Sequence, residues 1–182
     1  VSRPIARITG VGGRWLIQPG HTPRLHLAGA GTAVRFLTAA ALLAPPGAAI
    51  EIDGDDRMRQ RPIADLTDAL ALLGASVQST GAPARLPLRI MPPRDLASLP
   101  ARVAFTDPPS SQFISALMLA ACFLPRPLTI EVRGQLVSEP YVDMTWKLIQ
   151  RALRRTPITS HTRGVLSFRF PVVLPYHYAL DN

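Results

Sequence analysis

The chain has 182 residues, of which 47% are hydrophobic and 18% are charged. This composition excludes a disordered chain, and the length suffices for one domain with a buried hydrophobic core. The single cysteine, Cys122, excludes a disulfide framework, and the four scattered histidines lack metal-ligand spacing. We therefore expect no metal site.

The basic surplus is 20 Lys+Arg against 12 Asp+Glu, a net charge of +8. A surplus of this kind can bind nucleic acid, because cations release counterions from the phosphate backbone. Here, however, the arginines and the single lysine, Lys147, are spread singly along the chain instead of clustering with aromatic residues. The distribution favours small anionic substrates, which arginine binds with paired hydrogen bonds, and we expect no nucleic-acid partner.

The longest apolar stretches, Phe36 to Pro46 and Phe113 to Pro125, are shorter than the roughly 20 residues that a membrane helix needs. The first residues, Val1 to Thr9, lack the apolar core and small-residue cleavage site of a signal peptide. We expect no membrane partner and a cytoplasmic location.

The first predicted element is a hairpin, because Ile5 to Ile17 alternates around glycines. The second is an almost wholly apolar helix over 31–44, followed by a proline-containing turn and a strand at Ile50 to Ile52. Since no helix–strand–helix unit precedes the hairpin, the pattern predicts that the chain begins near the end of an earlier copy of a repeat.

An amphipathic helix is expected after Pro62, which suits the first turn of a helix. Gly74 supplies a C-terminal stop, and residues 75–90 predict a hairpin. The predicted buried stripe of this helix consists of Ile63, Leu66, Leu70 and Leu73.

The same series recurs about eighty positions later. An apolar helix is predicted over Ser110 to Leu124, a strand over Ile130 to Val132, and a hairpin over 156–170. The amphipathic helix between them follows Pro140 and has a predicted stripe of Tyr141, Met144, Leu148 and Ala152.

The repeat of about eighty residues predicts how the elements are arranged. Helices that are apolar all round are normally buried, so the chain is expected to form an α/β lobe of similar units with inner helices walled by sheets. The alternative is that the two units resemble each other by composition alone. The shared order of elements and the equivalent glycines, Gly54 and Gly134, favour the repeat.

Both apolar helices begin with small or hydroxyl residues, Gly29 to Thr32 and Ser110 to Gln112. Unpaired N–H groups and the positive end of the helix dipole favour anions there, although a simple helix cap explains either start alone. Three arginines alternate before the first amphipathic helix. These are Arg57, Arg59 and Arg61. They either bind an anion or form ion pairs with nearby aspartates.

Arg35 lies in a helix that is otherwise uncharged, and a buried guanidinium must be paired. The partner of the Arg35 guanidinium is either another residue of the fold or a substrate, and the sequence does not decide between them. Cys122 has no nearby base and is expected to be a small core residue. The sequence contains no nucleophilic triad, Walker loop or dinucleotide fingerprint.

Four motifs occur in order along the chain: AGTAVRFLTA (30–39), GDDRMRQRPIADL (54–66), SSQFISALM (110–118) and LVSEPYVDMT (136–145). Together they resemble the EPSP synthase family, the 3-phosphoshikimate 1-carboxyvinyltransferases. The resemblance covers almost the whole chain but only the larger part of the first of the family's two lobes. It implies repeated βαβαββ units, here the end of a first repeat (1–27), a second (28–106) and a third (107–182).

The resemblance also implies a reaction, the transfer of the enolpyruvyl group of phosphoenolpyruvate to the 5-hydroxyl of shikimate 3-phosphate, without a cofactor. The residues that match the phosphoenolpyruvate site are Gly31, Arg61 and Gln112. Those that match the shikimate 3-phosphate site are Ser110, Ser111, Gln112, Ser138 and Tyr141.

No catalytic acid or base is expected in this chain. In the family, a lysine near the chain start and groups from the second lobe complete the site, and none has a counterpart here. Lys147 is expected to be a solvated side chain, and the chain alone is expected to have little or no turnover. Gly29 and Phe36 stand where many members have Asn and Pro.

Two alternatives remain. The enolpyruvyl transferase that acts on UDP-N-acetylglucosamine shares the family fold but lacks the SSQ and RMRQRP motifs. The chain could also be a non-catalytic remnant that binds phosphorylated ligands or pairs with another polypeptide.

Overall fold

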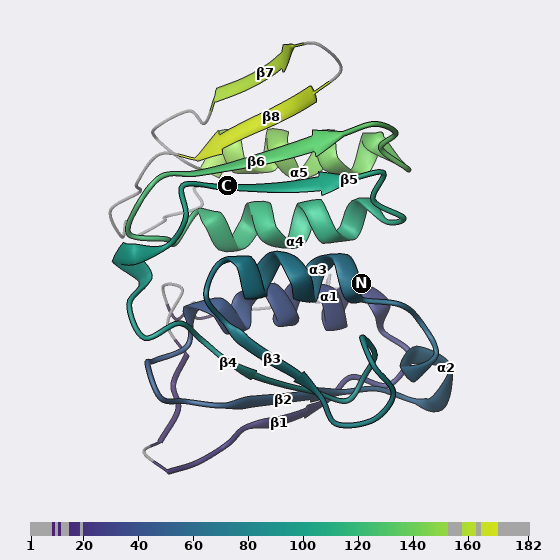
Figure 1. The fold of residues 1–182 in the computed structure, drawn as a ribbon, viewed down its shortest axis with the longest axis vertical. Coiled ribbons are helices and arrows are strands. Elements are labelled where there is room, and N and C mark those ends of the chain that lie inside the picture. Colours follow the sequence, from purple (N-terminus) through teal and green to yellow (C-terminus); the bar gives the residue numbers. More distant parts are fainter. Residues whose placement is uncertain are drawn as a thin grey trace, which may run out of the picture.

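The computed structural model describes residues 9, 11, 15–18, 20–152, 158–162 and 165–170. They form two four-stranded sheets with helices packed between them (Figure 1). None of the described helices is long and apolar enough to cross a membrane. The hairpin predicted over Ile5 to Ile17 lies largely outside the described residues.

The first sheet has the strand order β1-β2-β4-β3, in which β1 and β2 are parallel and the other pairs are antiparallel. The elements of this unit are β1 (Arg24–His26), α1 (Gly31–Ala40) with a 3₁₀ extension η1 (Ala41–Leu43), β2 (Ile50–Asp53), α2 (Asp56–Arg59), α3 (Ala64–Leu72), β3 (Ser76–Ser79) and β4 (Leu88–Met91).

The second sheet repeats this order and these strand directions as β5-β6-β8-β7. After a connecting 3₁₀ turn, η2 (Leu96–Ser98), its elements are β5 (Arg102–Thr106), α4 (Ser111–Ala121), β6 (Leu128–Arg133), α5 (Glu139–Ala152), β7 (Ile158–Thr162) and β8 (Val165–Phe170). The predicted repeat of βαβαββ units with helices between sheets is confirmed.

Strand pairing groups the first strand of each sheet with the strand that follows it. Among the described strands, β1 pairs with β2 alone and β5 pairs with β6 alone. By hydrogen bonding each of these strands therefore groups with the unit that follows it along the chain. The division of the chain at 27/28 and 106/107 stays a prediction.

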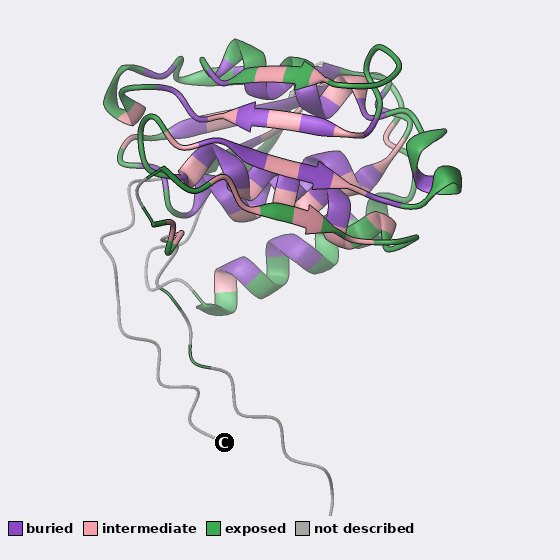
Figure 2. Ribbon diagram, turned by 90° about the horizontal axis from the view of Figure 1, so that it is seen from below, coloured by how far each residue is buried: buried purple, intermediate pink, exposed green. Residues whose placement is uncertain are grey.

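Alternation along the strands directs apolar side chains toward the helices. In β2, Ile50 and Ile52 are fully buried while Glu51 is only partly buried. In β6, Leu128, Ile130 and Val132 are buried in the same way. Because strand residues alternate between the two faces of a sheet, each sheet buries one face against the helical layer. Figure 2 shows the buried residues gathered in the strands and helices and the exposed residues along the loops.

The two apolar helices lie side by side at the centre, and α4 packs in turn against α5. Nearly every residue of α4 is buried, which confirms its predicted position in the interior. α1 is buried on one face only. Its partly exposed residues Phe36, Leu37 and Ala40 line an apolar groove of about 510 Å³ together with residues of α4.

The predicted stripe of the first amphipathic helix is confirmed, since its four residues are at most 1% exposed. The predicted stripe of the second is wrong. Tyr141, Met144 and Leu148 are each about 60% exposed, and Ala152 is exposed as well. The buried face of α5 consists of Val142, Thr145, Trp146 and Ile149.

The reason is that α5 has two apolar faces at helical spacing, and periodicity alone cannot choose between them. Packing against the second sheet determines which face of α5 is buried. Trp146 packs against Phe168 and Phe170 of β8, with ring centroids 5.1 and 5.8 Å apart. Burying the largest aromatic side chain removes the most apolar area from water, so the Trp146 face turns inward.

Cys122 follows α4 and is 7% exposed, as expected for a core residue. Burial raises the pKa of its thiol to about 12. The thiolate is the reactive form, so it is almost absent at pH 8 in the folded chain. We expect an aromatic disulfide reagent to modify Cys122 at least about 100-fold more slowly in the folded chain than in guanidinium chloride. Equal rates would contradict the buried position.

Candidate functional site

The first turns of α1 and α4 meet. The side-chain amide Nε2 of Gln112 donates a hydrogen bond to the Thr32 hydroxyl, with the two atoms 3.1 Å apart. These residues are 80 positions apart, which is the period of the repeat, and each is the second residue of its helix. Equivalent positions of the two units therefore face each other where both helices present their positive ends.

A cavity of about 780 Å³ opens beside this meeting point, between α4 and α5. All five residues predicted for shikimate 3-phosphate line it: Ser110, Ser111, Gln112, Ser138 and Tyr141. Its lining also includes apolar side chains, among them Phe36, Leu119 and Leu148. The cavity thus combines hydroxyl and amide donors with an apolar surface, as small-molecule sites commonly do.

Local structure positions the hydroxyls. Ser110 is the N-cap of α4, and its Oγ accepts a hydrogen bond from the backbone N–H of Gln112, with the two atoms 3.3 Å apart. Ser111 is the first residue of the helix and is 5% exposed. Ser138 has a positive φ of 56° immediately before α5, and its carbonyl accepts from the Tyr141 amide at 3.1 Å. The starts of α4 and α5 therefore supply opposite sides of one cavity.

Gly31 and Arg61 lie next to this cavity, at the start of α1. A Cβ at Gly31 would sit 3.1 Å from Nη1 of Arg61 and 2.7 Å from Nη1 of Arg35. Ala30, the N-cap, provides no side-chain hydrogen bond, so the first turn of α1 has no side-chain cap. Glycine, a nearby guanidinium and an uncapped helix start together suit a small oxyanion.

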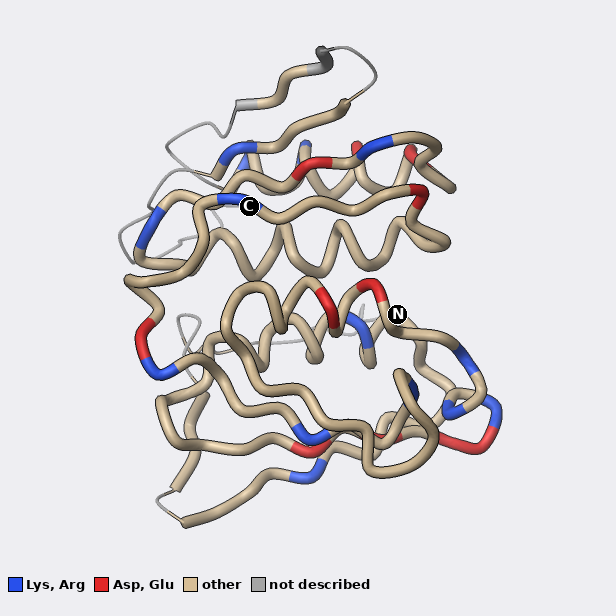
Figure 3. The backbone as a smooth tube through the Cα atoms, viewed as in Figure 1, with Lys and Arg blue, Asp and Glu red and all other residues tan. Residues whose placement is uncertain are grey.

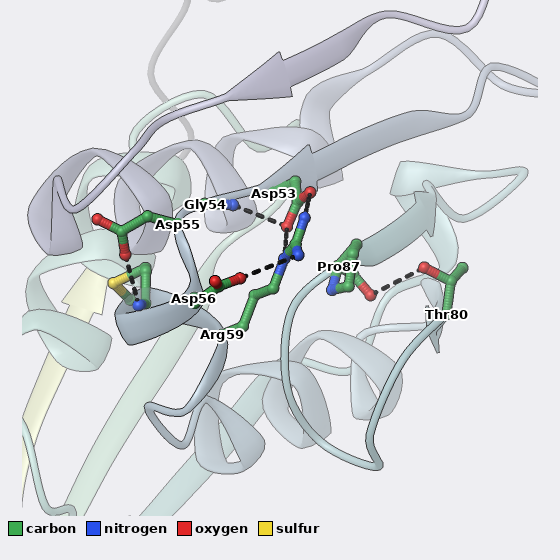
Figure 4. A network of polar contacts seen from close by, with 8 residues as sticks. Asp53, Gly54, Asp55, Asp56, Arg59, Thr80 and Pro87 are labelled. Carbon is green, nitrogen blue, oxygen red and sulfur yellow. Dashed lines mark hydrogen bonds and ion pairs between the residues drawn. The ribbon is translucent and has the colours of Figure 1, made fainter.

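The three alternating arginines, Arg57, Arg59 and Arg61, have different surroundings in the structure. Arg59 binds Asp53 through two hydrogen bonds of 2.9 and 2.6 Å, so for Arg59 local pairing is the correct interpretation (Figure 4). Its hydrogen bonds lower the pKa of Asp53. Asp55 caps α2 by accepting from the Met58 amide at 2.7 Å. Arg57 is exposed on α2, and of the three only Arg61 reaches Gly31.

Sequence reasoning missed two polar residues of the cavity wall, Ser115 and Thr145, and named a third, Thr32, only as part of a helix start. The hydroxyl of Thr145 donates to that of Ser115 at 2.9 Å, and both residues line the cavity together with Thr32. The repeat carried the signal for Thr32, because it occupies the position equivalent to Gln112. Ser115 and Thr145 face each other only after α4 and α5 pack, so no local pattern indicates them.

Charged residues lie on the strands, on the loops and on every α-helix except the apolar α4, which carries none (Figure 3). On the sheets, Glu51 pairs with Arg24 and Arg89, and Glu131 pairs with Arg102 and Arg133. Within the described residues, no group of three or more potential ligands is arranged to hold a metal ion.

Comparisons with known proteins identify the family. The sequence profile of EPSP synthase (3-phosphoshikimate 1-carboxyvinyltransferase) matches residues 5–158. A 3-phosphoshikimate 1-carboxyvinyltransferase of Ralstonia nicotianae is 38% identical over 173 residues, which cover 93% of this chain and 37% of that protein. One of Laribacter hongkongensis is 44% identical over 148 residues, covering 79% of this chain and 32% of that protein.

Among solved structures, EPSP synthase from Acinetobacter baumannii matches with a TM-score of 0.57 at 18% identity, over 80% of this chain and 30% of that chain. At this identity the likeness supports the fold alone. The chain spans about a third of the length of the curated relatives it matches. On the match of the family profile to most of its length, the chain belongs to the EPSP synthase family.

Proposed function

We propose that this chain is the anion-binding part of an enolpyruvyl transferase of aromatic amino acid biosynthesis. In the proposed reaction, the 5-hydroxyl oxygen of shikimate 3-phosphate forms a bond to C2 of phosphoenolpyruvate, and a proton adds to C3. The tetrahedral intermediate then loses a proton from that methyl group and releases phosphate, which leaves the enolpyruvyl ether. Both substrates are anions, in keeping with the donors of the site.

The observation that supports this proposal most strongly is the single cavity shared by the starts of α4 and α5. Three separate segments of the sequence line it: the start of α4 with Ser110 and Gln112, the start of α5 with Tyr141, and the start of α1 with Thr32. In the proposed complex, the serine hydroxyls donate to the phosphate of shikimate 3-phosphate, and the Tyr141 ring lies against the carbon ring. Gln112, held by Thr32, lies between the two substrates.

The proposed contribution of this part to the rate is positioning. It holds two anions side by side and places donors where charge develops in the tetrahedral intermediate. Gly31 leaves room for phosphoenolpyruvate, and Arg61 attracts it. The acid–base groups would come from a second lobe, which is the proposed partner. We therefore expect phosphate release from the two substrates only when a separately produced second lobe is added.

The direct test is a titration of the ¹⁵N-labelled 182-residue chain with shikimate 3-phosphate, comparing the wild type with Ser110→Ala/Ser111→Ala. Hydrogen bonds to charged groups contribute about 1.5–3 kcal/mol each, so the double substitution is expected to weaken binding at least about tenfold. Ser76→Ala changes an exposed serine of β3, outside the cavity, and serves as the control.

Ser110 also caps α4, so its loss can lower stability. Ser111→Ala alone leaves the cap intact and separates the two effects. Thermal unfolding of each variant, measured by circular dichroism, gives the folded fraction that the titration needs. Affinity that is unchanged in the folded double variant would overturn the proposed site.

A further inference from the structure

The exposed apolar side chains gather on one face of the molecule. In the described part of the chain eight large hydrophobic residues are well exposed, and seven of them line three adjoining hollows. These hollows are the α1–α4 groove, the α4–α5 cavity and a furrow of about 690 Å³ along the outer side of α5. Phe36 and Leu119 line both of the first two hollows. Met144 and Leu148 line both of the last two, so the three form one continuous face.

This apolar face is large for a monomer. Its seven side chains are 46–85% exposed, which together equals about four fully exposed side chains. At roughly 150 Å² for each large side chain, they expose on the order of 600 Å². The largest apolar patch on a typical monomer is about 300–600 Å², and a stable interface buries about 800 Å² on each partner. The face and the polar residues at its rim therefore have the size of one protein–protein interface.

The charged residues of α5 are ordered by sign along the helix. Glu139 and Asp143 lie in its first half and Lys147 and Arg151 in its second half, and all four are exposed. Because they are four residues apart, they form one row beside the exposed apolar stripe. Within the row, Nζ of Lys147 lies 2.6 Å from Oδ2 of Asp143. Figure 3 shows the two signs separated between the ends of α5.

A row of this kind is complementary to a second copy of itself in the antiparallel direction. A two-fold axis perpendicular to α5 sets the charged rows of two copies side by side, with the acidic half of each facing the basic half of the other. Asp143 of one copy then faces Lys147 of the other. The same axis sets the two apolar stripes against each other. A parallel pair would instead place like charges opposite each other, which disfavours association.

We propose that this face binds a second copy of the 182-residue chain, in a two-fold symmetric dimer whose α5 helices pack antiparallel. The apolar side chains supply most of the affinity, because their burial removes a contiguous apolar surface from water. The charged row fixes the register and the direction of the two helices. The proposal goes beyond the proposed function and does not depend on the reaction.

Sedimentation velocity of the ligand-free chain tests the dimer. The net charge of +8 opposes association, so the measurement is made at about 0.15 M salt, which screens long-range repulsion. We expect a monomer–dimer equilibrium whose dimer fraction rises with concentration. Asp143→Lys and Lys147→Glu each set like charges opposite each other in the proposed dimer, so each variant alone should dimerise at least about tenfold more weakly.

An equimolar mixture of the two variants is the decisive sample. In the mixed dimer the new lysine of Asp143→Lys faces the new glutamate of Lys147→Glu, and the two original residues face each other. We expect the mixture to dimerise about as strongly as the wild type. Asp68→Lys makes the same change of charge at an exposed position of α3, outside the three hollows, and should leave the dimer unchanged.

The competing occupant of the face is another βαβαββ unit of a longer chain. It predicts that the 182-residue chain stays monomeric at every concentration, or associates equally in the wild type, in each variant and in the mixture. Either result would overturn the proposal. Circular dichroism gives the folded fraction of each sample. If a charge variant does not fold, Met144→Glu provides the test, because it places a carboxylate in the exposed apolar stripe and should weaken the dimer at least about tenfold. A dimer that is unchanged in folded Met144→Glu would also overturn the proposal.

Discussion

Gly31→Ala is expected to weaken phosphoenolpyruvate binding about 100-fold while leaving the chain folded. The added Cβ would lie 2.7 Å from Nη1 of Arg35 and 3.1 Å from Nη1 of Arg61, so at least one guanidinium must move. A guanidinium that moves away loses its hydrogen bonds to the anion, which contribute about 1.5–3 kcal/mol each, and each 1.4 kcal/mol is a tenfold change in affinity. Alanine is the better helix former, so loss of helix stability does not explain the effect.

The measurement is isothermal titration with phosphoenolpyruvate, with thermal unfolding of the same samples. Gly81→Ala is the matched control, because Gly81 is exposed and its added Cβ would make a comparably close contact, 3.3 Å from Cδ of Pro87, without meeting Arg35 or Arg61. Shikimate 3-phosphate should still bind to Gly31→Ala, since the α4–α5 cavity does not include Gly31. Unchanged phosphoenolpyruvate affinity would show that the anion does not approach the start of α1.

Trp146→Ala is expected to lower the free energy of unfolding by about 3–5 kcal/mol, the range for large aromatic residues removed from a core. Trp146 is 6% exposed and contacts Phe168 and Phe170, so the substitution opens a cavity between α5 and its sheet. This loss is a large part of the 5–15 kcal/mol that stabilises a typical domain. Denaturant unfolding followed by circular dichroism measures it.

Leu148→Ala provides the comparison on the opposite face of the same helix. Leu148 is 61% exposed, so its truncation should change the free energy of unfolding by no more than about 0.5 kcal/mol. A larger loss for Leu148→Ala than for Trp146→Ala would reverse the orientation of α5 and restore the stripe predicted from the sequence.

Much of the fold could be predicted because its signals are local. Alternating residues indicated the strands, and the period of about 80 residues indicated that two units share one plan. The sequence also indicated the two helix starts as candidate anion sites, since small and hydroxyl residues there suit oxyanions. The hydrogen bond between Thr32 and Gln112 joins these two starts across the repeat, and it arises only when α1 and α4 pack.

Local sequence patterns failed to predict the structure where two alternative arrangements have the same periodicity. Both faces of α5 have apolar residues at helical spacing, and the aromatic residues of β8 decided which face is buried. Similarly, the three arginines before α3, two on α2 and Arg61 after it, alternate in the sequence, and their spacing alone does not distinguish their roles. In the structure, Arg59 forms an ion pair with Asp53 at the end of β2, whereas Arg61 lies beside Gly31.

The sequence by itself determined the order of elements, the repeat, the apolar character of α4 and the residue types at the helix starts, because each depends on neighbours within one or two turns. Only the tertiary structure decided that the starts of α4 and α5 share a cavity and that the buried Arg35 lies beside Arg61. These features depend on contacts between distant segments, whose free energies come from packing and desolvation instead of local backbone preference.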